Sequence, residues 1–280
     1  MSAAALFWQD GRLIAGDRLS LPATDRGLLL GDGLFETLLL LDGRLWRKAE
    51  HMQRLRDSAA ALALPLDDRP QRALDDLAAA APQGCWALRL TLTRGPGQRG
   101  LRLPDAPRPS VFASLSPWRL DAGGPLRLRQ SAIRRNESSP LSRLKTLGYL
   151  DNVLVLEAAV ADGADDALLL NGQGRAACTS AGNIFALIGD ALLTPPVEDG
   201  VLPGITRQAI LQRAGELGLD ARPQSLDPAQ LRAARLVFAV NSLRLIQPVV
   251  SLDGAALAQD AALLQRLDAL MRAEIQSSPR

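Results

Sequence analysis

The chain has 280 residues, of which 47% are hydrophobic and 22% are charged, and its formal net charge is +2. This composition is typical of a folded globular protein and argues against a disordered chain. Because 32 basic residues nearly balance 30 acidic ones, with no block of like charge, we expect no nucleic-acid groove and no anionic membrane face.

Histidine and cysteine, the usual zinc ligands, are scarce. The chain contains one histidine, His51, and two cysteines, Cys85 and Cys178. Zinc sites use clusters of these residues, so we expect no metal centre. The first ten residues, MSAAALFWQD, lack the basic stretch and apolar run of a signal peptide. No apolar run approaches the roughly 18 residues of a membrane helix, and we predict a cytoplasmic protein with reduced thiols.

The N-terminal part is predicted to begin with two hairpins, because Asp-Gly separates β-prone residues in ALFWQDGRLI and in LFETLLLLDGRLW. Apolar residues at helical spacing then predict helices within 49–64 and 69–81. CWALRLTLTRG and PSVFASLSPW predict two more strands. The composition changes at SPWRLDAGGPLR, so we place an interdomain linker at 118–125, between domains at 1–117 and 126–280.

The second half begins with a predicted strand, LRLRQSAIRR, followed by the polar loop NESSPLSRLK and a helix from about Gly148 to Ala161. Residues 165–196 predict a strand-rich meander, and a Pro-Gly entry predicts a helix that starts near Gly204 or Ile205. Strands RLVFAV and IQPVVSLDG and a helix from about 256 to 275 complete the chain. Strands and helices without strict βαβ alternation predict an α+β architecture in two domains.

Lysine is rare in this chain, and this draws attention to the lysines that remain. Only Lys48 and Lys145 occur among the 32 basic residues. A lysine amine can lose its proton and attack a carbonyl, whereas arginine forms no Schiff base. Lys48 precedes an amphipathic helix among charged neighbours, whereas Lys145 ends a Ser- and Pro-rich loop immediately before a helix. Lys145 is therefore the candidate reactive lysine, and a solvated surface lysine is the alternative interpretation.

The segment LPGITR predicts an anion site, because a glycine before a helix exposes the first free backbone N–H groups beside the Thr206 hydroxyl. Arg54 on the first helix could add the guanidinium that a phosphate prefers. A plain helix entry and a solvated helix arginine are the alternatives. A reactive lysine together with a phosphate site indicates pyridoxal phosphate.

These pieces belong to a longer pattern. The motifs are DRGLLLGDGLFET at 25–37, HMQRLRDSA at 51–59, TRGPGQRG at 93–100, PLSRLKTLGYLDNVL at 140–154, TSAGNIF at 179–185, LPGITRQAI at 202–210 and NSLRLIQPV at 241–249. In order and spacing they resemble the fold-type IV pyridoxal-phosphate enzymes, the class IV aminotransferases and 4-amino-4-deoxychorismate lyase. The resemblance implies a D-amino-acid aminotransferase-like fold, with a smaller N-terminal α/β domain and a C-terminal pseudo-barrel domain, and a homodimer.

The resemblance also assigns roles to single residues. By this resemblance, Lys145 is the Schiff-base lysine and proton shuttle. The residues that would bind the cofactor phosphate are Arg54, Ile205 and Thr206 through their amides, and Ser242. The resemblance also implies that Arg99 binds the substrate carboxylate and that Thr37 is a substrate-binding residue. Tyr149, the only tyrosine, lies four residues after Lys145, so one helical turn would place it on the same face, near the cofactor's phenolic oxygen. A packed aromatic is the alternative.

One position departs from the family pattern. The family has a glutamate five residues before the asparagine of its N-(apolar)-(aromatic) motif, and counting back from Asn183 gives Cys178. That glutamate keeps the pyridine nitrogen protonated and the ring a strong electron sink. A neutral thiol is a weak donor, so we expect a weaker sink unless a thiolate pairs with the pyridinium. The alternative is that Cys178 is only a small buried residue and another group serves the nitrogen.

The branch of the family is the remaining question. RGPGQRG and NSL resemble the lyase, which converts 4-amino-4-deoxychorismate to 4-aminobenzoate and pyruvate in folate synthesis. LPGITRQAI and Glu36 fit the aminotransferases as well, so a D-amino-acid or branched-chain aminotransferase is the second hypothesis. A non-catalytic paralogue that binds pyridoxal phosphate without turnover is the third.

Overall fold

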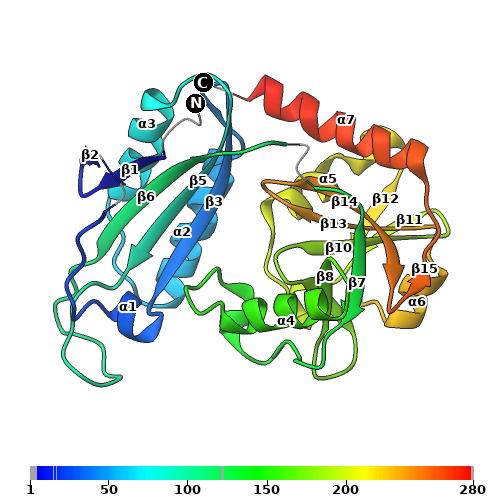
Figure 1. The fold of residues 1–280 in the computed structure, drawn as a ribbon, viewed down its shortest axis with the longest axis horizontal. Helices are drawn as coiled ribbons and strands as arrows, with labels where there is room; N and C mark the ends of the chain where they lie inside the picture. The colour runs from blue at the N-terminus through cyan, green and yellow to red at the C-terminus, as the bar shows by residue number, and fades with distance from the viewer. Residues whose placement is uncertain (1–4, 15, 17, 121–122, 279–280) are drawn as a thin grey trace. The chain divides into compact units, whose positions relative to one another are not determined.

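The computed structural model describes residues 5–14, 16, 18–120 and 123–278, which fold into two compact units (Figure 1). The first unit contains the described residues of 1–119, the segment Leu144–Gly148 and the chain end from Ile275. The second contains those of 120–143 and Tyr149–Glu274. The units thus differ from the predicted division at 118–125, because Leu144–Gly148 hydrogen-bonds to a strand of the first unit.

The first unit is built on an antiparallel sheet with the strand order β2-β1-β6-β5-β3-β4. The strands are β1 (Leu6–Gln9), β2 (Arg12–Ile14), β3 (Gly33–Leu41), β4 (Arg44–Leu45), β5 (Cys85–Thr93) and β6 (Ser110–Pro117). Both predicted hairpins are confirmed, with Asp10-Gly11 and Asp42-Gly43 at the turns and a positive φ at all four residues. Two-residue turns of this kind match the twist of the strands, and Asp-Gly tolerates their backbone conformation.

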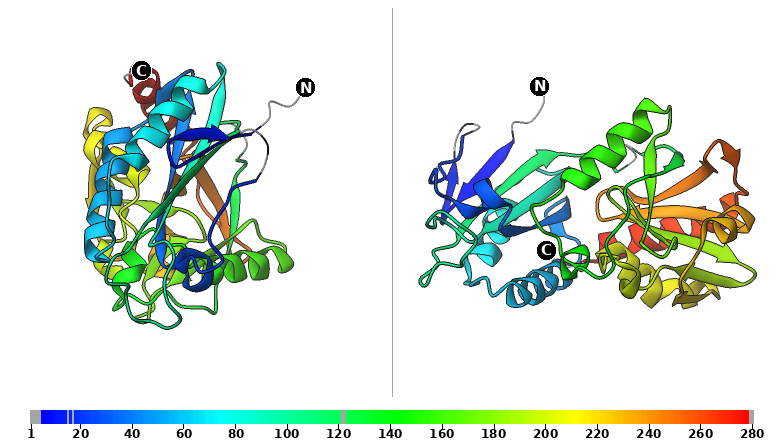
Figure 2. Two further views of the ribbon diagram at one scale, coloured as in Figure 1. Left: turned by 90° about the vertical axis from the view of Figure 1, so that its left-hand side faces the viewer. Right: turned by 90° about the horizontal axis from the view of Figure 1, so that it is seen from below.

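Helices cover one face of this sheet. The helices are α1 (Arg26–Leu30), α2 (Lys48–Ala61) and α3 (Arg69–Ala80), and α2 and α3 pack on the sheet (Figures 1 and 2). Leu34, Leu38 and Leu40 of β3 belong to the core beneath them. Because side chains alternate along a strand, Phe35 and Thr37 lie on the opposite face of the sheet.

The second unit contains a strand barrel. Its order is β10-β13-β14-β7-β8-β9, and the ring closes where Cys178 of β9 pairs with Asn183 of β10. These strands are β7 (Leu126–Gln130), β8 (Asp166–Leu170), β9 (Ala176–Thr179), β10 (Asn183–Ile188), β13 (Leu236–Asn241) and β14 (Leu245–Leu252). The sheet is extended by β11 (Ala191–Thr194), β12 (Asp220–Pro223) and β15 (Ala255–Ala256). Closure removes the open edges of a sheet, and leucine, valine and alanine side chains fill the core.

The helices that belong wholly or mainly to the second unit are α4 (Leu150–Ala161), α5 (Ile205–Arg213), α6 (Pro228–Ala233) and α7 (Ala261–Ser277). Two helix starts differ from the prediction. α4 begins at Leu150 rather than near Gly148, and α7 begins at Ala261 rather than 256, because Ala255–Ala256 pairs with β14. The prediction missed α6, although Asp227 and Gln230 form a capping box around Pro228. None of the described helices is long and apolar enough to cross a membrane.

Candidate functional site

Lys145 lies on an extended segment beside the start of β3. The Phe35 N–H donates to the Lys145 carbonyl over 2.9 Å, and the Leu147 N–H donates to the Gly33 carbonyl over 3.1 Å. Between them, Leu34 and Thr146 form an antiparallel β-bridge. The expectation that Lys145 immediately precedes a helix is therefore wrong, because these backbone groups pair with a strand. This pairing anchors the lysine by its backbone to the rigid sheet of the first unit.

The Lys145 amine lies over an aromatic ring that also carries an arginine. Lys145 Nζ is 4.2 Å from the centroid of the Phe35 ring, and Arg89 Cζ is 3.8 Å from it. The register pairs Arg89 with Thr37, so Phe35, Thr37 and Arg89 share one face of the sheet. Sequence reasoning missed Phe35 and Arg89. The sequence feature that could have indicated them is the two-residue alternation of the strands, which places both side chains on the same face as Thr37, opposite the core leucines.

On the opposite face of β3, Glu36 is buried in an ion pair with α2. Arg54 Nε donates to Glu36 Oε1 over 2.8 Å and Nη2 donates to Oε2 over 2.6 Å, while His51 Nδ1 is 2.7 Å from Oε2. Burial raises the pKa of Glu36, but the Arg54 charge and the hydrogen bonds outweigh it and lower this pKa to about 2. Burial lowers the pKa of His51. Arg54, predicted to hold a phosphate, is thus already oriented by a carboxylate.

The second unit carries the remaining predicted cofactor residues. Cys178 is buried on β9, beside Asn183 of β10, and packs against apolar side chains that include Val155 and Val201. Burial raises the pKa of the Cys178 thiol, and the opposing effect of the Arg135 charge is smaller. The thiol is therefore neutral near pH 7, which argues against the thiolate alternative.

The amino end of α5 has the features of an anion site. Its N-cap is Gly204, which offers no side chain to the first N–H groups. A Cβ at Gly204 would lie 1.9 Å from Asn183 Oδ1, so glycine is required for this close approach. Ile205 and Thr206 are both buried, and Thr206 Oγ1 is a buried polar atom with no hydrogen-bond partner among the described residues. A phosphate would satisfy both the amides and this hydroxyl.

The other predicted residues are less enclosed. Ser242 is half-buried between β13 and β14, and Arg99 is exposed in the loop between β5 and β6. Tyr149 occupies the N-cap of α4, and Lys145 lies outside that helix and in the other unit. The expectation that one helical turn joins Lys145 to Tyr149 is therefore wrong. Lys48, the other lysine, forms an ion pair with Asp75 of α3.

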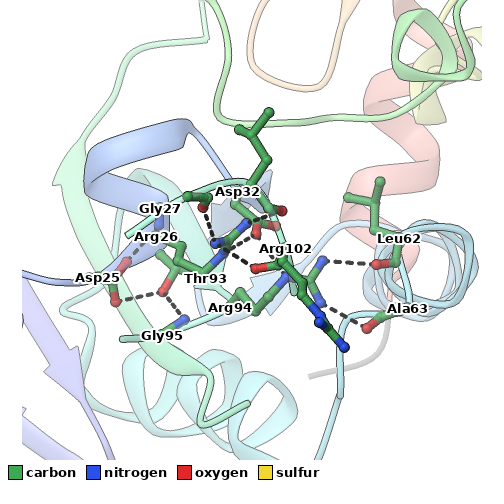
Figure 3. Close-up of polar contacts among 12 residues, drawn as sticks. Asp25, Arg26, Gly27, Asp32, Leu62, Ala63, Thr93, Arg94, Gly95 and Arg102 are labelled. Atoms are coloured by element: carbon green, nitrogen blue, oxygen red, sulfur yellow. Dashed lines mark hydrogen bonds and ion pairs between the residues drawn. The ribbon is translucent and has the colours of Figure 1, made fainter. Parts of the chain in front are cut away.

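A partly buried polar network holds the loop that carries Arg99 (Figure 3). Asp32 accepts from Arg26 Nε and from Arg94 Nε, each over 2.8 Å. Arg26 also donates to the carbonyls of 100–102, and Arg94 donates to those of Leu62 and Ala63 after α2. The start of the loop at Arg94, its middle at 100–102 and the end of α2 are thus tied to one carboxylate.

Comparison with known proteins identifies the family of the chain. Residues 33–252 match the family model described as amino-transferase class IV. The chain belongs to the class IV aminotransferase family. A bifunctional aminodeoxychorismate lyase / D-amino acid transaminase of Mycobacterium tuberculosis is 32% identical over 272 residues, covering 89% of this chain and 91% of that protein.

Two solved structures resemble this member of the class IV aminotransferase family over nearly its whole length. A branched-chain aminotransferase of Thermoproteus uzoniensis with norvaline has a TM-score of 0.89 at 27% identity, covering 97% of this chain and 95% of that one. A hypothetical aminotransferase of Mycobacterium tuberculosis in its PLP-bound form has a TM-score of 0.86 at 27% identity, covering 97% and 99%. The predicted family and the α+β fold-type IV architecture are confirmed.

Proposed function

We propose that this class IV aminotransferase homologue is a pyridoxal-phosphate-dependent lyase that converts 4-amino-4-deoxychorismate to 4-aminobenzoate and pyruvate, a step of folate synthesis. The observation that carries the choice of lyase is the buried, neutral Cys178 thiol at the position of the family glutamate. A thiol stabilises a protonated pyridine nitrogen less than a carboxylate does. Loss of pyruvate makes the substrate ring aromatic, so this reaction demands less of the cofactor than transamination does.

The cofactor is pyridoxal phosphate, and the residues of the chain fit it. When bound, it supplies an aldehyde that condenses with amines and a ring that withdraws electrons from the attached amine. The proposal assigns its phosphate to Arg54, Ser242, the Ile205 and Thr206 amides and the Thr206 hydroxyl. Thr206 Oγ1 supports this assignment, because this buried hydroxyl has no other partner among the residues that the structure describes.

The remaining polar groups are assigned to proton transfer and substrate binding. Lys145 would attach the cofactor and afterwards move a proton with its amine, which the Phe35 ring holds in place. Arg89 and Arg99 are the candidates for a substrate carboxylate, and Thr37, which pairs with Arg89 across the sheet, is the other proposed substrate-binding residue. Arg89 is the better placed of the two, because its guanidinium lies on the same ring as the lysine amine.

A D-amino-acid or branched-chain aminotransferase is the second candidate. It is favoured by the names of the relatives, which include a D-amino acid transaminase and a branched-chain aminotransferase. A paralogue that binds the cofactor without turnover is the third candidate, motivated by Cys178.

The assay that separates these candidates starts from purified protein reconstituted with pyridoxal phosphate. We expect release of 4-aminobenzoate and pyruvate in equal amounts from 4-amino-4-deoxychorismate. Transfer of an amino group from a D- or L-amino acid to 2-oxoglutarate or pyruvate, without lyase turnover, would favour the second candidate. Cofactor binding with no product from any amine would favour the third.

The position of Cys178 offers a sharper test. We expect Cys178→Glu to raise the transamination rate about tenfold or more and to change the lyase rate much less, because a carboxylate would hold a proton on the pyridine nitrogen. Both rates are measured on the same preparation after thermal unfolding has shown that the variant is folded. Cys178→Ser, which stays neutral and small, serves as the control. An equal change of both rates in Cys178→Glu contradicts this reading of the thiol.

We also propose that the protein is a cytoplasmic homodimer. Four apolar side chains of α4 are at least half exposed, namely Leu150 at 76%, Leu154 at 56%, Val160 at 53% and Val153 at 50%. An apolar patch of this kind is typical of a protein interface. Light scattering is expected to give twice the chain mass for the wild type and a monomer for Leu154→Glu. The control Arg56→Glu on α2 should stay dimeric, and a monomeric wild type would refute the proposal.

A further inference from the structure

The buried cluster of Glu36, His51 and Arg54 stands at an unusual place for charged side chains. Glu36 lies between Leu34 and Leu38 in the row of β3 residues that faces the core. Glu36 is 1% exposed, His51 is fully buried and Arg54 is 9% exposed. Apolar side chains of similar size would give a stable core here without the desolvation of two charges. The cluster therefore needs a reason other than stability.

The protonation states of the cluster follow from its geometry. With its pKa near 2, Glu36 is a carboxylate and can only accept hydrogen bonds. Burial and the charges of Arg54 and Lys145 all lower the pKa of His51, which outweighs the opposing effect of Glu36 and keeps the ring neutral near pH 7. The proton of this neutral ring must be on Nδ1, because that nitrogen is 2.7 Å from Glu36 Oε2.

The result is a chain of fixed groups that ends on one guanidinium. His51 donates to the carboxylate, and the carboxylate accepts two parallel hydrogen bonds from Arg54 Nε and Nη2. Two such bonds fix the plane of the guanidinium as well as its position. His51 and Arg54 are three residues apart on α2 and therefore lie on the same side of the helix, facing β3. The arginine side chain is long and flexible, and these hydrogen bonds already fix its torsion angles in the folded protein.

We propose that Glu36 and His51 are positioning residues that hold the Arg54 guanidinium in a single orientation for a phosphate group, and that they set the affinity of this chain for a phosphate-bearing cofactor. The inference rests on the proposed function, which assigns Arg54 to the cofactor phosphate. The ordering entropy of the arginine is lost during folding rather than on binding, so the bound phosphate gains the full interaction. Neither positioning residue touches the phosphate in this scheme, and both act through Arg54.

The test compares two ligands that differ only in the phosphate. Affinities for pyridoxal phosphate and for pyridoxal are measured by absorbance titration of the full-length apoprotein. Glu36→Gln and His51→Leu are expected to weaken binding of pyridoxal phosphate about tenfold or more, the effect of one lost hydrogen bond to a charged group. Binding of pyridoxal should change less than about threefold. His51→Asn should restore most of the affinity, because its amide can donate from nearly the position of Nδ1.

A matched variant on the same helix completes the design. Glu50→Gln also removes one carboxylate of α2, but its side chain is 37% exposed and faces Arg47, so both affinities should equal those of the wild type. Thermal unfolding of each variant with and without ligand shows that it is folded.

The outcomes separate the inference from the function on which it rests. If the wild type binds neither ligand, or binds both equally well, the proposed phosphate site fails and the inference fails with it. If the wild type prefers pyridoxal phosphate and Arg54→Gln loses that preference, the phosphate site stands. In that case, unchanged selectivity in Glu36→Gln, or equal weakening for both ligands, overturns the inference alone.

Discussion

Lys145→Ala is expected to abolish covalent attachment of pyridoxal phosphate and to lower turnover by about 10²–10⁴-fold, the usual contribution of a proton-transferring side chain. The amine of Lys145 lies 4.2 Å from the centre of the Phe35 ring, and the lysine backbone is hydrogen-bonded to β3, so the amine is held at a defined place. Attachment is measured by borohydride reduction followed by mass analysis of the peptides. The wild type should carry the reduced cofactor on the peptide that contains Lys145.

The two lysines of the chain provide the control. Lys48→Ala removes an amine whose structural partner is Asp75 and should leave both labelling and turnover at the wild-type level. Lys145→Arg keeps the positive charge but cannot lose its proton, and it should be as inactive as Lys145→Ala. Substantial turnover in Lys145→Arg would mean that the lysine contributes only its charge, and labelling at Lys48 would refute the assignment.

Asp32→Ala is expected to lower the free energy of unfolding by about 3–5 kcal/mol, the usual result of removing one partner from a buried ion pair. Arg26 and Arg94, which both donate to Asp32, are only 4% and 3% exposed and would keep their charges without this carboxylate. Urea unfolding followed by circular dichroism measures the difference. Because Arg26 also binds the carbonyls of 100–102, amide exchange in the loop that carries Arg99 should become faster.

The same network gives stability a dependence on pH. Burial raises the pKa of Asp32, but the hydrogen bonds and charges of Arg94 and Arg26 together lower it below its ordinary value of 3.8. A depressed pKa in the folded state adds stability above pH 3.8 that is lost as the pH falls through the folded value. Asp32→Asn should lose this part of the acid dependence. Asp75→Ala, at a surface ion pair, should cost less than about 1 kcal/mol. An equal cost for both aspartates would contradict the importance of the network.

Features with short-range causes could be predicted from the sequence. Asp10-Gly11 and Asp42-Gly43 form their turns because the conformation that each dipeptide tolerates selects the hairpin. α5 begins at Ile205, as the Pro-Gly entry predicts, and the extent of α3 follows the prediction within one residue. The order and spacing of seven motifs were enough for the family, and a family implies its fold and its cofactor.

Pairings between distant segments escaped the same reasoning. The helical relation between Lys145 and Tyr149 is absent because the lysine backbone pairs with β3, more than a hundred residues earlier in the chain. The two-residue alternation gives the face on which Arg89 lies, but its proximity to Phe35 and Lys145 appears only in the folded chain. Backbone groups next to Lys145 could satisfy their hydrogen bonds in a helix or on a strand, and local propensity does not decide between them.

The sequence by itself determined the family, the hairpins and the helix that begins at Ile205, because each depends on residues close together in the chain. The rarity of lysine made Lys145 the candidate reactive lysine. Only the tertiary structure decided the environment of each group. It showed that Arg54 is held by Glu36 and His51, that Thr206 Oγ1 is buried without a partner among the described residues, and that burial keeps the Cys178 thiol neutral. Desolvation and charge pairing depend on which side chains meet in space, and side chains from distant segments meet only after the chain has folded.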